Sequence, residues 1–443
     1  MKRILTLFLA LILIPVLPSC GDEQAESVET AEGTTEVVTE PAEDVAEETK
    51  SEEEAKTRAP SNRVYESCAD PLTRARVEAI PVANSSMTTD ELRQICVDYV
   101  CLSVSFQWIP NSDYQYKVVR QEAVARFYEG QLYGGIPYVN VASGNLYRIL
   151  EIYDSETGIM DLTPFRQKNL LWGTACSGTT GWGWARVINS AKCAWTADLN
   201  TYNGLLRVGA YTYDDSTKRY GENGKEDCND IAKRNGAEMM YSCYAQMKMA
   251  DCLVNNGHVR MVKSVHTELD TNGNIDPKKS YVMQCEQGLY TTSAIHDRIS
   301  SDGTKYKIQG NDDLKSSFYE LYKGGYLPHT FKEFLGLDPV EPSYATIGLE
   351  TDTVSLRDLQ RCTLTSNYVI SDVFTTLYDK DGKELFSYIK RMDNHFEREI
   401  TLLEAIPGSA VQKHQTSGDA TIKITCQLGT GEHKTVYEGT LKG

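Results

Sequence analysis

The sequence has little that would support a metal centre or nucleic-acid binding. Its 12 cysteines include no pair with the CxxC spacing of zinc sites, and its 7 histidines are scattered. The stretch Asp270–Asn274 begins like a calcium loop, but the loop has Ile275 in place of the required glycine and Tyr281 in place of the terminal glutamate. The net charge is −17, with no basic stripe. We therefore expect no metal, no cofactor and no nucleic-acid partner.

The sequence also lacks an apolar run of membrane-spanning length near its start. The run Ile4–Leu17 is too short to cross a bilayer and follows Lys2 and Arg3. A short apolar run after a positive start is typical of an export signal. The residues Leu17-Pro18-Ser19-Cys20-Gly21 resemble a bacterial lipoprotein signal, which implies that Cys20 is lipidated and becomes the mature N-terminus.

We therefore expect a lipoprotein signal peptide over residues 1–20 and an extracytoplasmic protein. A lipid on Cys20 would anchor it to a bacterial membrane, at the cell surface or in the periplasm. The alternative is an ordinary secretory peptide with a chance cysteine.

The next segment lacks aromatic residues altogether. Asp22–Thr57 holds 14 acidic residues against two lysines, so it cannot bury enough apolar area to offset its ordering entropy. We expect residues 21–60 to be a disordered acidic linker. The first 57 residues supply −10 of the net charge of −17, which leaves only −7 for the remainder.

The 383 residues after Pro60 are enough for two domains. Pro339 and Pro342 mark a linker between them, so we expect one domain over residues 61–340 and a second over 343–443. The second domain has short alternating segments such as Thr421–Leu428, which predict a β-sandwich of immunoglobulin-like size.

Helices are expected mainly in the first domain. Thr88–Glu91 has the form of a capping box and precedes apolar residues at helical spacing. Further helices are predicted over Gln121–Tyr128, within Glu226–Gln246 and over Asp312–Tyr322. Together with predicted strands on either side of His258, they indicate an α+β fold.

Cys176 is the candidate nucleophile. It lies in Leu171–Val187, just after a turn of small residues and at the start of a predicted helix. Unpaired N–H groups and the helix dipole favour thiolate over thiol at such a position. The alternative is a buried structural cysteine. Without Cys20 an odd 11 cysteines remain, so at least one thiol is unpaired within the chain, while the pairing of the others, or their complete reduction, stays open.

Two further candidates follow Cys176 in the chain. Asp251–Val262 reads as strand, turn and strand, with His258 at the start of the second strand, and the next strand, Tyr281–Glu286, ends at Glu286. An imidazole between a thiol and a carboxylate suits nucleophilic catalysis, since it takes and returns a proton while the acid fixes its tautomer. Gln284 and Gln287 are alternatives for the third position.

Four motifs in this order resemble the NlpC-type cell-wall cysteine peptidases of the papain-like clan, which are close to the CHAP amidases. They are Gly135-Ile136-Pro137-Tyr138, Gly-Thr-Ala-Cys176-Ser-Gly, Gly257-His258-Val259, and the strand beginning at Asp251. The resemblance covers Tyr133–Gln287 and implies a papain-like α+β domain over residues 61–340, with an N-terminal helical extension. The interval between Cys176 and His258 is long for the NlpC type, and Glu286 replaces its usual third histidine, as in the CHAP pattern.

The resemblance also implies a function and its residues. Cys176, His258 and Glu286 would be catalytic, and Tyr138 would be either a wall of the substrate cleft or plain packing. The substrate would be a peptidoglycan stem peptide, cut by an endopeptidase or amidase between γ-linked D-glutamate and a diamino acid, or between muramic acid and L-alanine. The alternative is an inactive surface lipoprotein that binds glycan or protein ligands.

The lipid anchor gives the first prediction. Cys20→Ala removes the acceptor for the lipid, so the protein should move from the membrane fraction to the soluble fraction. Immunoblotting of the two fractions measures this, with Ser19→Ala as the control, which keeps the acceptor thiol. Unchanged fractionation of Cys20→Ala would contradict the lipoprotein prediction.

Overall fold

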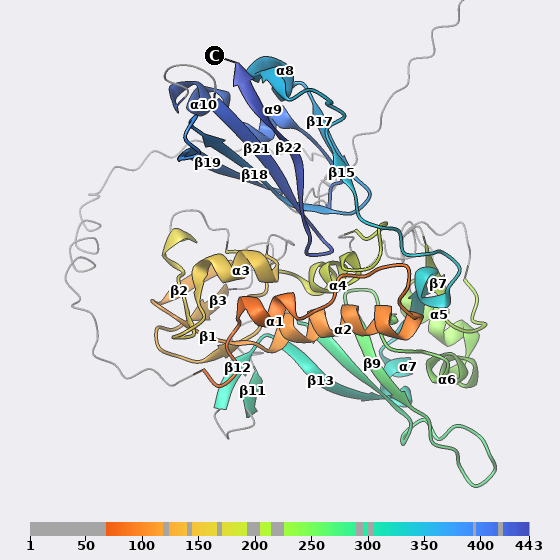
Figure 1. Cartoon of the computed structure of the whole chain (residues 1–443). Coiled ribbons are helices and arrows are strands. Elements are labelled where there is room, and N and C mark those ends of the chain that lie inside the picture. The colour runs from red at the N-terminus through yellow and green to blue at the C-terminus, as the bar shows by residue number, and fades with distance from the viewer. Residues whose placement is uncertain are drawn as a thin grey trace, which may run out of the picture. The chain divides into compact units, whose positions relative to one another are not determined.

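The computed structural model describes residues 68–117, 124–139, 144–165, 171–192, 204–213, 226–288, 296–299, 305–392, 396–414 and 420–442. These residues belong to one compact unit, Tyr65–Gly443, and form an α+β fold with several sheets (Figure 1). The predicted signal peptide, its Cys20 and the predicted acidic linker lie outside the described residues. In the part of the chain described, no helix is both long and apolar enough to cross a bilayer.

Helix α2, Thr89–Ser105, is the longest of the described helices and begins as the sequence predicts. Thr88 and Glu91 form the expected capping box, in which the Glu91 carboxylate accepts from the Thr88 backbone N–H at 2.7 Å. Helix α4, Cys176–Ala185, packs directly against it. A Cβ atom at Gly183 would lie 2.5 Å from Val100 Cγ2 of α2, so only glycine permits this approach.

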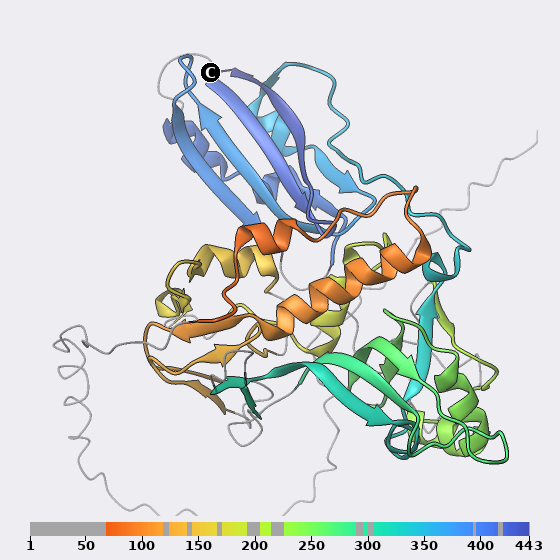
Figure 2. The ribbon, with the colours of Figure 1, turned by 60° about the horizontal axis from the view of Figure 1, so that its bottom comes forward.

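Both helices pack on a six-stranded antiparallel sheet (Figures 1 and 2). Its strands, in spatial order, are β13 (Gly310–Ser317), β10 (Tyr281–Gln287), β9 (Val259–His266), β8 (Cys252–Val254), β14 (Leu327–Phe331) and β7 (Leu205–Arg207). The predicted strand, turn and strand around His258 are confirmed as β8 and β9, and the returning strand as β10.

A second six-stranded sheet is mixed in direction. Its order is β11 (His296–Ile299), β12 (Lys305–Ile308), β4 (Tyr133–Gly134), β1 (Gln107–Pro110), β6 (Ile159–Met160) and β5 (Tyr153–Asp154). Around these sheets lie α1 (Arg74–Glu78), α3 (Leu146–Ile152), α5 (Cys228–Asn235), α6 (Ala237–Ala245), α7 (Phe318–Lys323) and the 3-10 turns Thr163–Phe165 and Glu333–Leu335. The helix predicted within Glu226–Gln246 is thus two helices, separated by Gly236 with a φ of 82°.

Two predicted helices are wrong. The described part of Gln121–Tyr128 is strand β3 (Val124–Phe127), which pairs with β2 (Tyr114–Lys117). Phe127 is fully buried, with ring centroids 4.8 Å from Trp108 and 4.9 Å from Tyr133. Burial of this ring in an aromatic cluster outweighs helix propensity.

The second error is Asp312–Tyr322. Its first half continues β13, and helix α7 begins only at Phe318, after a capping box formed by Ser317 and Glu320. The polar residues of this segment form no pattern that predicts a strand. Backbone pairing with β10 makes the segment a strand.

The C-terminal segment contains the predicted short strands. One sheet has the order β16 (Thr353–Ser355), β22 (His433–Lys442), β21 (Ala420–Leu428), β18 (Ile370–Tyr378) and β19 (Glu384–Arg391), and a smaller one has β15 (Ala345–Thr346), β17 (Thr363–Ser366) and β20 (Glu399–Thr401). Helices α8 (Leu356–Gln360), α9 (Leu402–Ala405) and α10 (Gly408–His414) accompany them. The alternation predicted for β21 is confirmed, because Ile422, Ile424 and Cys426 are fully buried.

A buried ion pair joins this segment to helix α3. Arg148 Nη2 lies 3.0 Å from Asp372 Oδ1, and both side chains are 1% exposed. The same guanidinium group donates to the Ser371 and Met392 carbonyl oxygens, each at 2.8 Å. Loss of the Asp372 carboxylate would take an anionic partner away from the buried Arg148 charge, which is costly in the interior. Asp372 itself also lies 3.3 Å from Arg391 Nη1.

This pair gives a stability prediction. Asp372→Asn should lower the free energy of unfolding by about 3–5 kcal/mol, because Arg148 then keeps its charge in the interior. Urea denaturation followed by tryptophan fluorescence measures the loss. The control is Glu78→Gln, whose exposed pair with Arg74 should contribute less than about 0.5 kcal/mol. Equal losses of unfolding free energy for the two substitutions would contradict the stabilising role of the buried ion pair.

Candidate active site

Cys176 is the first residue of helix α4, as the sequence predicts. The residue before it, Ala175, offers no side-chain cap, and the first helical hydrogen bond runs from Thr179 N–H to the Ala175 carbonyl oxygen at 2.9 Å. The backbone N–H groups of the first turn therefore have no acceptor within the helix. They direct the positive end of the helix dipole toward the thiol.

His258 lies immediately before strand β9, after a tight turn. Asn255 N–H donates to the His258 carbonyl oxygen at 2.9 Å, which closes the turn. The Asn256 side chain accepts from the Cys228 N–H of α5 at 2.8 Å and ties the turn to that helix. These two hydrogen bonds fix the backbone of the turn that carries the His258 imidazole.

The structure brings Cys176, His258 and Glu286 together. The Cys176 thiol and the His258 side chain are hydrogen bonded. His258 Nε2 lies 2.6 Å from Glu286 Oε2, so the imidazole connects the thiol to the carboxylate. The alternatives for the third position bond elsewhere: the Gln284 side chain donates to the Val282 carbonyl oxygen and that of Gln287 to the Ile136 carbonyl oxygen.

The electrostatics favour a thiolate and an imidazolium. Burial by itself raises the pKa of the Cys176 thiol, but the hydrogen bond and charge of His258, with the N–H groups of Val259 and Ser177, outweigh burial and lower that pKa. Burial also opposes a charge on His258, yet its bonds to Cys176 and Glu286 raise the pKa of the imidazole to about 9. Between the two pKa values the pair is charged.

The other described cysteines differ from Cys176 in the surroundings of their thiols. All 10 cysteines within the described residues are free thiols. Burial raises the pKa of Cys68 to about 11 and that of Cys426 to about 12, and it raises the pKa of Cys252 well above its usual range. Cys176 is therefore the described thiol whose surroundings activate it.

Tyr138 lies close to the site along the backbone but is largely buried. It forms a β-bridge with Thr174, two residues before Cys176, and its N–H donates to the Gln309 side chain at 2.8 Å. The residue is 5% exposed. The structure therefore shows Tyr138 packed in the interior, and its contact with substrate stays a prediction.

Two further residues of the site, Arg260 and Tyr326, were not predicted from the sequence. Arg260 Nε lies 2.7 Å from Glu286 Oε2, and its guanidinium group lies over the Tyr326 ring. Arg260 is the second residue of β9 and stands two residues after His258, so in extended backbone the two side chains point to the same side. That spacing was the available signal. Tyr326 comes from a distant segment and gave none.

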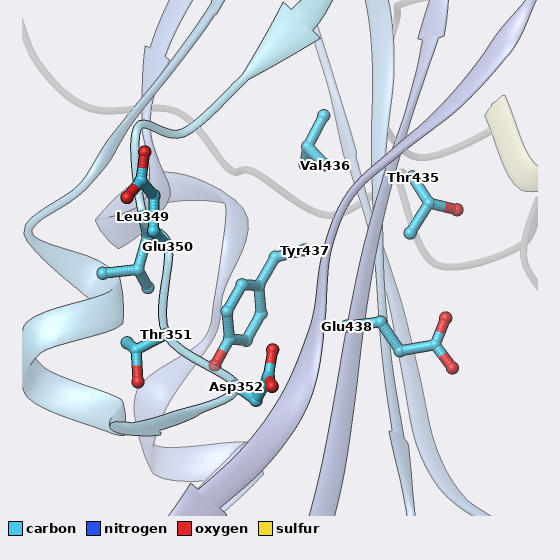
Figure 3. A pocket seen from close by; sticks show the side chains of 8 residues that line it. All are labelled: Leu349, Glu350, Thr351, Asp352, Thr435, Val436, Tyr437 and Glu438. Atoms are coloured by element: carbon cyan, nitrogen blue, oxygen red, sulfur yellow. The ribbon is translucent and has the colours of Figure 1, made fainter.

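A separate hollow of about 310 Å³ lies in the C-terminal segment, between the loop before β16 and strand β22 (Figure 3). It is lined mainly by polar residues: Leu349, Glu350, Thr351, Asp352, Thr435, Val436, Tyr437 and Glu438. None of the three candidate catalytic residues lines it. Over the described ranges, no group of three or more His, Cys, Asp or Glu side chains is placed to hold a metal ion.

Comparisons with protein-family models, with curated proteins and with solved structures find no match to this chain. Any function must therefore be argued from the residues and geometry of the site.

The charged pair predicts the reactivity of Cys176. Iodoacetamide at about pH 6 should alkylate Cys176 before the other described cysteines, because its thiolate persists at a pH where ordinary thiols with a pKa of about 8.5 are protonated. Peptide mapping by mass spectrometry locates the label.

Two variants test the cause. His258→Ala removes the imidazolium, so the labelling rate at about pH 6 should fall at least about tenfold and should recover only at alkaline pH. Cys362→Ala is the matched control and should leave the Cys176 rate unchanged. Labelling of Cys176 at the rate of the other thiols would contradict the ion pair.

Proposed function

We propose that the protein is a cysteine hydrolase that cleaves amide bonds of peptidoglycan stem peptides, as an endopeptidase or amidase. The observation that carries the proposal is His258, bonded to the Cys176 thiol on one side and to the Glu286 carboxylate on the other. A thiol, an imidazole and an orienting acid are the parts that nucleophilic acyl transfer requires. The proposal includes a papain-like fold for residues 61–340 and an immunoglobulin-like sandwich for 343–443.

The first half of the reaction uses the charged pair. The Cys176 thiolate attacks the carbonyl carbon of the amide, a C–S bond forms, and negative charge moves to the carbonyl oxygen. Backbone N–H groups in the first turn of α4 stabilise this charge. The C–N bond then breaks as the His258 imidazolium gives its proton to the leaving amine. A thioester on Cys176 and a neutral imidazole remain.

The second half restores the enzyme. The neutral His258 takes a proton from water, and the resulting hydroxide attacks the thioester carbon. The C–S bond breaks, a carboxylic acid leaves, and the thiolate and imidazolium pair forms again. Glu286 keeps Nε2 of the ring occupied in both halves and thereby holds the other nitrogen toward sulfur.

The substrate class is supported by the sequence. The four motifs resemble those of cell-wall peptidases, and the lipoprotein-type start implies a place outside the cytoplasm, where peptidoglycan lies. In this proposal Tyr138, which forms a β-bridge with Thr174 two residues before Cys176, contributes to the wall of the substrate cleft.

Purified muropeptides provide the test. The full chain carrying Cys20→Ala should convert them to products that contain one added water, seen by liquid chromatography and mass spectrometry. Release of the peptide from muramic acid identifies an amidase, and shortening of the peptide identifies an endopeptidase. Cys176→Ala should abolish turnover, because it removes the nucleophile, while Cys362→Ala should retain it.

Two results would contradict the proposal in whole or in part. If Cys176 is alkylated rapidly but no muropeptide is cleaved, the thiol chemistry stands and the substrate assignment is wrong. If Cys176 is not reactive and no muropeptide is cleaved, a binding protein takes the place of the enzyme.

A further inference from the structure

Glu286 uses one oxygen for two partners. Its Oε2 lies 2.6 Å from His258 Nε2 and 2.7 Å from Arg260 Nε. The Glu286 side chain is 8% exposed, so its negative charge is largely removed from water. A buried carboxylate between an imidazole and a guanidinium group shares its charge between them.

Arg260 itself is held on its other sides. The guanidinium carbon lies 4.6 Å from the centroid of the Tyr326 ring, within the range of a cation–π contact. Its Nη1 donates to Ser316 Oγ of strand β13 at 3.4 Å. Two separate segments, one with Tyr326 and the other with Ser316, therefore fix where the guanidinium group meets Glu286.

We propose that Arg260 is a positioning residue of the Cys176–His258–Glu286 site, which anchors the Glu286 carboxylate at His258 Nε2 and offsets its charge. Without that offset, the full charge of Glu286 would act on the imidazolium and make it a weaker acid. Arg260 thereby keeps His258 able to give its proton to the leaving amine. This catalytic consequence rests on the proposed function, but the effect on the Cys176–His258 pair does not.

The groups around the pair set the direction of the effect. The titratable side chains that the described structure places against His258 and Glu286 are Cys176 from α4, Arg260 from β9 and Tyr326 from the segment before β14. Burial raises the pKa of Tyr326 to about 12, so its hydroxyl is neutral throughout the range in which His258 titrates. Loss of the Arg260 cation should therefore move the His258 titration to higher pH.

The pH profile of Cys176 alkylation by iodoacetate tests this without any substrate. The imidazolium attracts the negative reagent, so the rate should fall as His258 loses its proton near a pKa of about 9. Arg260→Gln, which keeps a planar amide beside Tyr326, should move this upper limb to higher pH by about one unit. Arg260→Lys retains the charge and should leave the limb near its wild-type position.

A merely structural contact predicts something else. If Arg260 only supports the fold, its loss displaces Glu286 and leaves the imidazolium less stabilised, so the upper limb stays in place or moves to lower pH. Either result would overturn the proposal. Circular dichroism checks folding, and Arg260→Met is a second neutral variant that should shift the limb in the same direction if Arg260→Gln does not fold.

Muropeptide turnover provides the second readout. Arg260→Gln should lower kcat by about tenfold with little change in KM, because a weaker acid at His258 slows proton transfer and leaves binding alone. Arg260→Lys should restore most of the rate. A shifted alkylation profile in a protein that cleaves no muropeptide would retain the role of Arg260 and would remove only the proposed substrate.

Discussion

The contact between helices α2 and α4 is the constraint on which the candidate site depends. Gly183 brings the two backbones so close that any side chain there would collide with Val100. Because interiors are close-packed, this contact leaves α4 little freedom to move. The N-terminal end of α4 therefore stays fixed beside β9 and β10, and Cys176 lies there next to His258. Residues of the C-terminal segment also pack against α4. The ring centroids of Phe396 and Trp182 are 4.5 Å apart, and Gly429 packs against Ala185.

Two opposing effects meet in the site. Burial favours neutral forms of the thiol, the imidazole and the carboxylate alike. It raises the pKa of other buried cysteines, such as Cys96, Cys252 and Cys285. Opposite charges at hydrogen-bond distance reverse that preference only where they are adjacent. Cys176, His258, Glu286 and Arg260 alternate in the charge that they carry, so each stabilises the ionised form of the next. The same alternation occurs at Arg148 and Asp372, where it joins two parts of the chain and has no nucleophile to activate.

Much of the local structure was predictable because its signals are local. The capping box at Thr88, the helix beginning at Cys176 and the turn before His258 depend on residues a few positions apart. The errors have a common cause. At Phe127 packing in an aromatic cluster with Trp108 and Tyr133 decided for strand, and over Asp312–Ser317 pairing with β10 did so. The hydrophobic pattern of each segment alone does not show such packing or pairing.

By itself the sequence determined the mixed α+β composition, the candidate thiol, the imidazole and the order in which they occur. It favoured Glu286 for the third position but left Gln284 and Gln287 as alternatives, because the register of β10 shifts against both neighbouring strands in this region. Such bulges change which side chains face a site, and they form only when strands pair. Tertiary structure alone decided that Glu286 meets the imidazole and that Arg260 and Tyr326 stand behind it. The physical reason is that hydrogen bonds and charge pairs act over a few ångströms of space, and folding sets those distances between residues far apart in the chain.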